Sequence, residues 1–133
     1  MIYLDHNATT KIEPSVLEAM MPYLEDHYGN PASNHRFGRR AHTAIEAARE
    51  QVAAAVNAHP SQVIFTSSGS ESNNLIIQGL ASSNEQMHFA YSAIEHPCIS
   101  RPIEQLKSRG YGAIKINVTS NGMVDLDGMD QDT

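Results

Sequence analysis

The sequence has one cysteine, Cys98, and no apolar run long enough to cross a membrane. A lone cysteine cannot form a disulfide within the chain, which suits a reducing compartment. The first residues, Met1 to His6, also lack the basic segment and long apolar core of a secretory leader. These absences predict a cytoplasmic protein with no membrane partner.

Clustered positive charge is missing too. The chain has 9 Lys and Arg against 15 Asp and Glu, a formal net charge of −6, and no basic run. The nearest approach, Arg36, Arg39 and Arg40, fits the solvated face of a helix. A nucleic-acid partner is therefore not expected, because phosphate backbones are bound by clustered Lys and Arg.

Several ligand motifs are also absent. The histidines have no metal-ligand spacing such as H-E-x-x-H, so no metal site is predicted. Neither G-x-G-x-x-G after a strand nor G-x-x-x-x-G-K-[ST] occurs, which argues against a dinucleotide or a nucleoside triphosphate. There is no G-x-S-x-G elbow for a serine nucleophile.

What is present suits one globular domain. With 133 residues, 41% of them hydrophobic, the chain can bury a core. The pattern divides it into an N-terminal arm over residues 1–13, a helical segment over 14–60, and strand–helix units over 61–133.

The helical segment contains two predicted amphipathic helices. The first covers Pro14 to Leu24, with the proline at its start. The second covers about Asn34 to Ala58, where apolar residues follow helical spacing and Pro60 lies just past the end.

Strands and helices alternate in the last stretch. Strands are predicted over 62–66, 87–91 and 111–118, and helices over about 70–82 and 96–109, with Gly110 past the end of the second helix. This alternation predicts an α/β fold with a mostly parallel sheet flanked by helices. Ligands of such sheets bind beyond the carboxyl ends of the strands, where residues 67–70 and 95–96 fall.

The turn Ser67-Ser68-Gly69-Ser70 is the first candidate site. It places hydroxyls and a glycine at a helix start, where unpaired amides and the helix dipole favour an anion. The alternative is a capping box, in which Ser68 caps the helix and Glu71 reaches back to the Ser68 amide. An anion fits there only if Glu71 does turn back, and from this segment alone both interpretations stay open.

His96 is the second candidate. Because it precedes Pro97, its backbone is expected to be extended, which directs the ring away from the helix. Such a ring can stack on a flat cofactor or move a proton near neutral pH. The alternative is a histidine that only caps the helix start. Cys98, one turn into this helix, is expected to be packed rather than reactive.

Four segments in order resemble the N-terminal part of the cysteine desulfurases, in the class V group of pyridoxal-phosphate enzymes. They are Tyr3-Leu4-Asp5-His6-Asn7-Ala8-Thr9-Thr10, Tyr28-Gly29-Asn30-Pro31-Ala32-Ser33, Phe65-Thr66-Ser67-Ser68-Gly69-Ser70-Glu71-Ser72-Asn73-Asn74 and Ile94-Glu95-His96-Pro97. Asn121-Gly122-Met123-Val124-Asp125 also fits the turn after the third strand. The resemblance covers essentially the whole chain.

The resemblance implies part of the large domain of a fold-type I aminotransferase fold, and a homodimer. It also implies an enzyme that takes sulfur from L-cysteine, leaves alanine, and passes persulfide sulfur to acceptors such as iron–sulfur scaffold proteins. Gly69 and Ser70 match the pair that holds the phosphate of pyridoxal 5′-phosphate. His96 matches the histidine that stacks on the pyridine ring and can move protons.

Three departures from the family pattern affect these expectations. Ser68-Gly69-Ser70 stands where Gly-Ala-Thr is usual, which predicts weaker phosphate binding. Lys11 stands where proline is usual, which affects only the arm.

The third departure is the largest. Within 133 residues there is no counterpart of the family's Schiff-base lysine, of the carboxylate that pairs with the pyridine nitrogen, or of the sulfur-accepting cysteine. Lys11, Lys107 and Lys115 lie outside any such motif, and Cys98 is not assigned the role of the nucleophile.

We therefore expect one incomplete domain, inactive alone and without a family-type covalent link to the cofactor. We also expect it to be marginally folded, or completed by another chain. Two alternatives stay open. One is a sibling class V enzyme, such as a selenocysteine lyase or an aminotransferase. The other is a non-catalytic interaction or dimerisation module.

Overall fold

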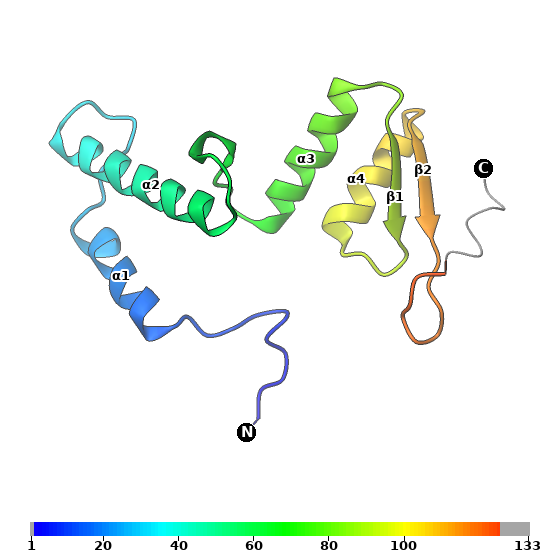
Figure 1. Cartoon of the computed structure of the whole chain (residues 1–133), viewed down its shortest axis with the longest axis horizontal. Coiled ribbons are helices and arrows are strands. Elements are labelled where there is room, and N and C mark those ends of the chain that lie inside the picture. The colour runs from blue at the N-terminus through cyan, green and yellow to red at the C-terminus, as the bar shows by residue number, and fades with distance from the viewer. Residues whose placement is uncertain (1, 126–133) are drawn as a thin grey trace. The chain divides into compact units, whose positions relative to one another are not determined.

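The computed structural model describes residues 2–125. The chain forms two compact units, Met1–Ile64 and Phe65–Thr133 (Figure 1). Among residues 2–125, no helix is long and apolar enough to span a bilayer.

The first unit contains both predicted helices. Helix α1 covers Pro14–Glu25 and starts at its proline, as expected. Helix α2 covers Arg36–Ala55 and is shorter at both ends than the prediction. At its start, His35 has extended backbone, and its Nδ1 accepts a hydrogen bond of 3.3 Å from the Gly38 amide. At its end, Asn57 has a left-handed φ of 53°, which stops the helix.

The loop between the two helices packs tightly on the first turn of α2. A Cβ at Gly38 would lie 2.1 Å from the carbonyl oxygen of Ser33 and 2.6 Å from that of Asn30. A Cβ at Gly29 would lie 2.4 Å from the carbonyl oxygen of Phe37. Both glycines are therefore needed for this close backbone approach.

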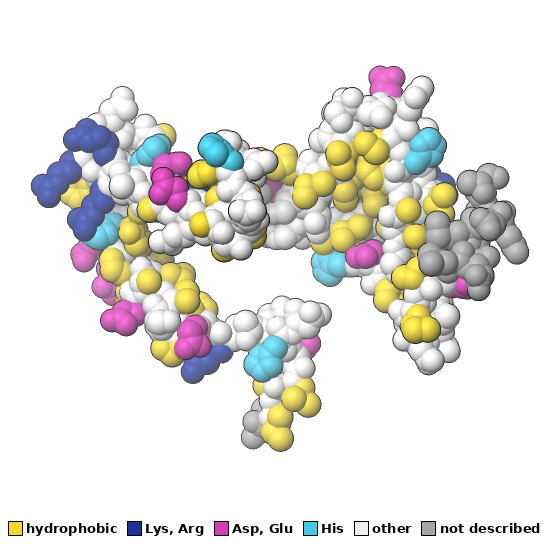
Figure 2. All heavy atoms as spheres, in the orientation of Figure 1, with side chains coloured by type: hydrophobic (Ala, Val, Ile, Leu, Met, Phe, Trp, Pro, Cys, Tyr) yellow, Lys and Arg dark blue, Asp and Glu magenta, His cyan; other side chains and the backbone are white. Residues whose placement is uncertain are grey.

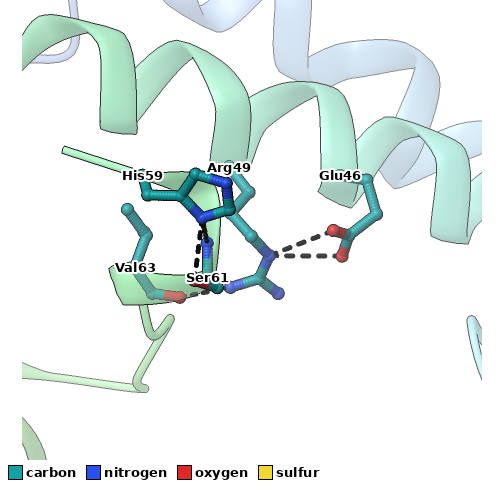
Figure 3. A network of polar contacts seen from close by, with 5 residues as sticks. All are labelled: Glu46, Arg49, His59, Ser61 and Val63. Atoms are coloured by element: carbon teal, nitrogen blue, oxygen red, sulfur yellow. Dashed lines mark hydrogen bonds and ion pairs between the residues drawn. The ribbon is translucent and has the colours of Figure 1, made fainter. Parts of the chain in front are cut away.

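After α2 the chain turns back and is held to the helix by Arg49 (Figure 3). The guanidinium donates to both oxygens of Glu46 at 3.2 Å and to the carbonyl oxygen of Val63. The 3-10 helix η1, Pro60–Gln62, is capped by His59, whose Nδ1 lies 2.8 Å from the Ser61 hydroxyl. This network holds the chain after α2 against that helix.

The strand predicted over residues 62–66 is wrong. Residues 60–62 form η1, and Val63 is extended with φ −95° and ψ 125°, but no described segment pairs with it. The Val63 carbonyl is bonded by Arg49 instead. Extended backbone and apolar side chains become a strand only when a neighbouring strand supplies the hydrogen-bond ladder.

The second unit is α/β, with a parallel sheet flanked by helices, as predicted. It contains α3 (Gly69–Ser83), β1 (His88–Ser92), α4 (Pro97–Ser108) and β2 (Gly112–Ile116). The two strands pair in parallel, from His88 opposite Gly112 to Ser92 opposite Ile116, and their arrows point the same way in Figure 1. The sheet has two strands within the described residues, because the predicted strand before the serine turn did not form.

Helix α4 connects the strands and contacts both of them, and α3 packs against α4. The buried core consists of Ile77 and Ala81 from α3, Tyr91 from β1, and Ile103 and Leu106 from α4. The Tyr111 hydroxyl donates to the carbonyl oxygen of Ala81 at 3.1 Å and so ties the end of α3 to the start of β2. Gly110, with φ 98°, ends α4 as expected.

Candidate functional site

The start of α3 is capped in a way that leaves room for a ligand. Ser68 is the N-cap residue, and its hydroxyl accepts from the Glu71 amide at 3.3 Å. The Glu71 carboxylate turns back, as expected, but to Ser67 rather than to the Ser68 amide. It accepts from the Ser67 amide and the Ser67 hydroxyl, both at 2.6 Å. These two bonds lower the pKa of Glu71, the hydroxyl contributing more than the amide.

Because the Glu71 carboxylate bonds to Ser67, the amides of Gly69 and Ser70 remain open. Among the described residues, nothing accepts a hydrogen bond from the Gly69 amide, the Ser70 amide or the Ser70 hydroxyl. A Cβ built on Gly69 would have no atom within 4 Å. The helix start therefore offers three donors and free space, the chemistry that a phosphate ester needs.

His96 lies at the start of α4, a few residues after the carboxyl end of β1. Its backbone is extended, with φ −60° and ψ 146°, and its Nδ1 accepts from the Cys98 amide at 3.1 Å. His96 therefore does cap the start of α4, through Nδ1, as the capping alternative predicted. A neutral ring that accepts at Nδ1 carries its proton on Nε2. The ring plane and Nε2 of the exposed side chain remain available to a ligand.

Ser70 and His96 line one cleft of about 380 Å³ in the second unit. The other lining residues are Asn74, Pro97, Cys98, Arg101, Pro102 and Gln105. Gly69, the third predicted residue, is the neighbour of Ser70 but is not among those that line the cleft. The structure thus brings a hydroxyl from α3 and an imidazole from α4 to one cavity.

The sequence interpretation missed Asn74 and Arg101. Both signals were present: Asn74 lies one turn after Ser70, and Arg101 lies one turn after Cys98, the spacings at which helical residues share a face. Arg101 is the cationic side chain of the lining and adds positive potential to a cleft that already contains amide donors.

The two helices are also linked beside the cleft. The Asn73 side-chain amide donates to the Cys98 sulfur at 3.1 Å, and both residues are partly buried. Cys98 is half-buried, in agreement with the expectation that it is packed. Among residues 2–125, no group of three or more His, Cys, Asp or Glu is placed to hold a metal ion.

Comparisons with known proteins agree on one family. The sequence profile described as Aminotransferase class-V matches residues 2–132. A cysteine desulfurase of Nostoc sp. is 46% identical over 128 residues, which cover 96% of this chain and 32% of that protein. The chain therefore spans about a third of the length of the curated relatives it matches.

Solved structures give the same result. One described as a NifS-like protein superimposes with a TM-score of 0.85 at 35% identity, over 95% of this chain and 35% of the other. Another, described as SspA in complex with cysteine, gives a TM-score of 0.77 at 40% identity, over 84% of this chain and 33% of the other.

Proposed function

Because the chain belongs to the aminotransferase class-V family, we propose that it is the cofactor-binding N-terminal part of a pyridoxal-phosphate-dependent cysteine desulfurase. The observation that carries the proposal is the cleft of the second unit, which is lined by both Ser70, from the start of α3, and His96, from the start of α4. The identity to cysteine desulfurases and the likeness to a structure with bound cysteine support L-cysteine as the substrate of the whole protein.

The residues of the cleft fit the cofactor. The amides of Gly69 and Ser70 and the Ser70 hydroxyl would hold the phosphate, and the open space over Gly69 allows it to approach the backbone. The His96 ring would stack on the pyridine ring, held in orientation by its bond to the Cys98 amide. Arg101 adds attraction for the anionic phosphate or for a substrate carboxylate.

When bound, pyridoxal phosphate supplies an electron-withdrawing ring that stabilises the negative charge formed next to the substrate amine. His96 would contribute a proton donor and acceptor. While Nδ1 accepts from the Cys98 amide, the neutral ring carries its proton on Nε2 and would donate from there; it would take a proton at Nδ1 only when that bond is released. Pro97 and Pro102 contribute apolar atoms to the cleft wall.

The proposal extends to the whole protein in four respects. It would release sulfur from L-cysteine to leave alanine, pass persulfide sulfur to an acceptor such as an iron–sulfur scaffold protein, form a homodimer, and work in the cytoplasm. The 133-residue chain alone is expected to be inactive, because a family-type lysine and a sulfur-accepting cysteine have no counterpart in it. Alanine release from L-cysteine by this chain alone would contradict that expectation.

Equilibrium dialysis against pyridoxal phosphate and against phosphate-free pyridoxal tests the site. Ser70→Ala should weaken binding of pyridoxal phosphate about three- to ten-fold and leave pyridoxal unchanged, because only the phosphate contact is lost. His96→Ala should weaken both ligands, because ring stacking is common to them.

Ser82→Ala is a matched control, because it removes a hydroxyl bonded within the last turn of α3, outside the cleft lining. Gly69→Ala sharpens the test further. It restores the alanine usual in the family, so it should leave the unfolding free energy unchanged or raised, since its Cβ meets nothing, and should not weaken the phosphate-bearing ligand. Equal weakening of both ligands by Ser70→Ala, or no binding at all, would favour the interaction-module alternative.

A further inference from the structure

We propose that Asn73 and Cys98 are positioning residues, which set the relative placement of the two helix starts that form the cleft. The expected effect on cofactor binding rests on the proposed function. The contact itself is independent of that function: it is a hydrogen bond of 3.1 Å from the Asn73 amide nitrogen to the Cys98 sulfur.

Cys98 connects the two candidate binding groups through two different atoms. Its backbone amide donates to Nδ1 of His96 and so fixes the imidazole ring at the start of α4. Its side-chain sulfur accepts from Asn73, which lies one turn after Ser70 in α3. One residue thus links the ring of His96 to the helix that carries the predicted phosphate site.

Near the cleft, the hydrogen bond from Asn73 to Cys98 is the polar side-chain contact that joins α3 to α4 among the described residues. The core residues Ile77, Ala81, Ile103 and Leu106 hold the helices together farther along, toward their carboxyl ends. At their amino-terminal ends, the hydrogen bond from Asn73 to Cys98 is the side-chain bond between α3 and α4 that the described residues form. Loss of it would let the helix starts move apart while the core stays packed.

The test uses single and double substitutions in the full chain, with Ser82→Ala as the control. Asn73→Ala and Cys98→Ala should each weaken pyridoxal phosphate binding about three- to ten-fold. The double variant should bind no more weakly than either single one, because both remove the same bond. Cys98→Ser keeps an acceptor and should restore much of the affinity, which a role in packing alone would not predict.

A readout without ligand separates this inference from the proposed function. The ring nitrogens of His96, followed by NMR, should shift in Asn73→Ala, although Asn73 lies on the other helix, and should not shift in the control. If no pyridoxal phosphate binds but His96 responds to Asn73→Ala, the proposed function fails and the positioning link stands. Additive losses in the double variant, or an unchanged His96 spectrum in Asn73→Ala, would overturn the inference.

Discussion

The two units of this chain bury their apolar residues very differently. In the second unit, side chains from α3, β1 and α4 close around Leu106, which is 2% exposed. In the described part of the first unit, the buried apolar residues are Ala41 and Ala53, both on α2. Helix α1 has no buried residue, although Val16, Leu17, Met20, Met21 and Leu24 recur at helical spacing. Figure 2 shows hydrophobic side chains on the surface of this segment. Helical periodicity therefore identifies the side of a helix that requires a partner, and does not show that the partner is there.

The largest test of this comparison is a pair of leucine truncations. Leu106→Ala should lower the free energy of unfolding by about 2–5 kcal/mol, because it leaves a cavity in the core. Leu24→Ala, at a residue that is 65% exposed, should change it by less than about 0.5 kcal/mol. Urea unfolding followed by circular dichroism measures both. A loss at Leu24 as large as that at Leu106 would mean that α1 is covered in solution.

Two helical glycines provide the next contrast. Gly38→Ala in α2 should destabilise by about 1–3 kcal/mol, because the new Cβ would collide with the loop carbonyls of Asn30 and Ser33. Gly79→Ala in α3 should stabilise by about 1 kcal/mol, since nothing lies within 4 Å of its Cβ and alanine favours the helix. Thermal unfolding of both variants decides the matter. Stabilisation by Gly38→Ala would show that the loop does not pack there.

Capping of α3 gives a smaller effect. Ser68→Ala removes the oxygen that accepts from the Glu71 amide and should cost about 1 kcal/mol. Ser68→Asp keeps an acceptor at the N-cap and should recover most of the loss. Denaturant unfolding of the two variants makes the comparison. Equal losses in both would argue that the hydroxyl, rather than the cap, is required.

The smallest expected effect is the pH dependence contributed by Glu71. Its folded pKa lies below the ordinary value of a glutamate because Ser67 donates two hydrogen bonds to the carboxylate, from its hydroxyl and its amide. The resulting stabilisation is fully present above the unfolded pKa and is lost as pH falls through the folded pKa. Between pH 6 and pH 3, the free energy of unfolding should therefore fall less steeply with falling pH in Glu71→Gln than in the unaltered chain. Identical pH profiles would show that the bonds to Ser67 do not persist in solution.

Local signals made much of the fold predictable. Pro14 and Pro97 marked the starts of α1 and α4, and Gly110 marked the end of α4, because these residues act through their own backbone. The strand over residues 62–66 was wrong, because a strand depends on a partner that no local pattern reveals. Val63 has the expected extended backbone, but its carbonyl is bonded to Arg49.

The candidate site shows the same division. The donors at Gly69 and Ser70 and the extended backbone of His96 follow from neighbouring residues, so the sequence predicted them. The placement of Ser70 and His96 along one cleft, and the bond from Asn73 to Cys98, depend on how α3 packs against α4. Such contacts between distant positions are set by the core around Leu106, which composition and spacing do not describe.

The parallel pairing of β1 and β2 across α4 has a consequence for biosynthesis. Strand β1, helix α4 and strand β2 all lie between His88 and Ile116, so only short stretches of chain must close before the apolar residues of α4 meet the two strands. Folding speed rises as contacts become more local, and chains fold from the amino terminus as they are made. We therefore expect a strand–helix–strand nucleus to assemble around Ile103 and Leu106 soon after Ile116 leaves the ribosome.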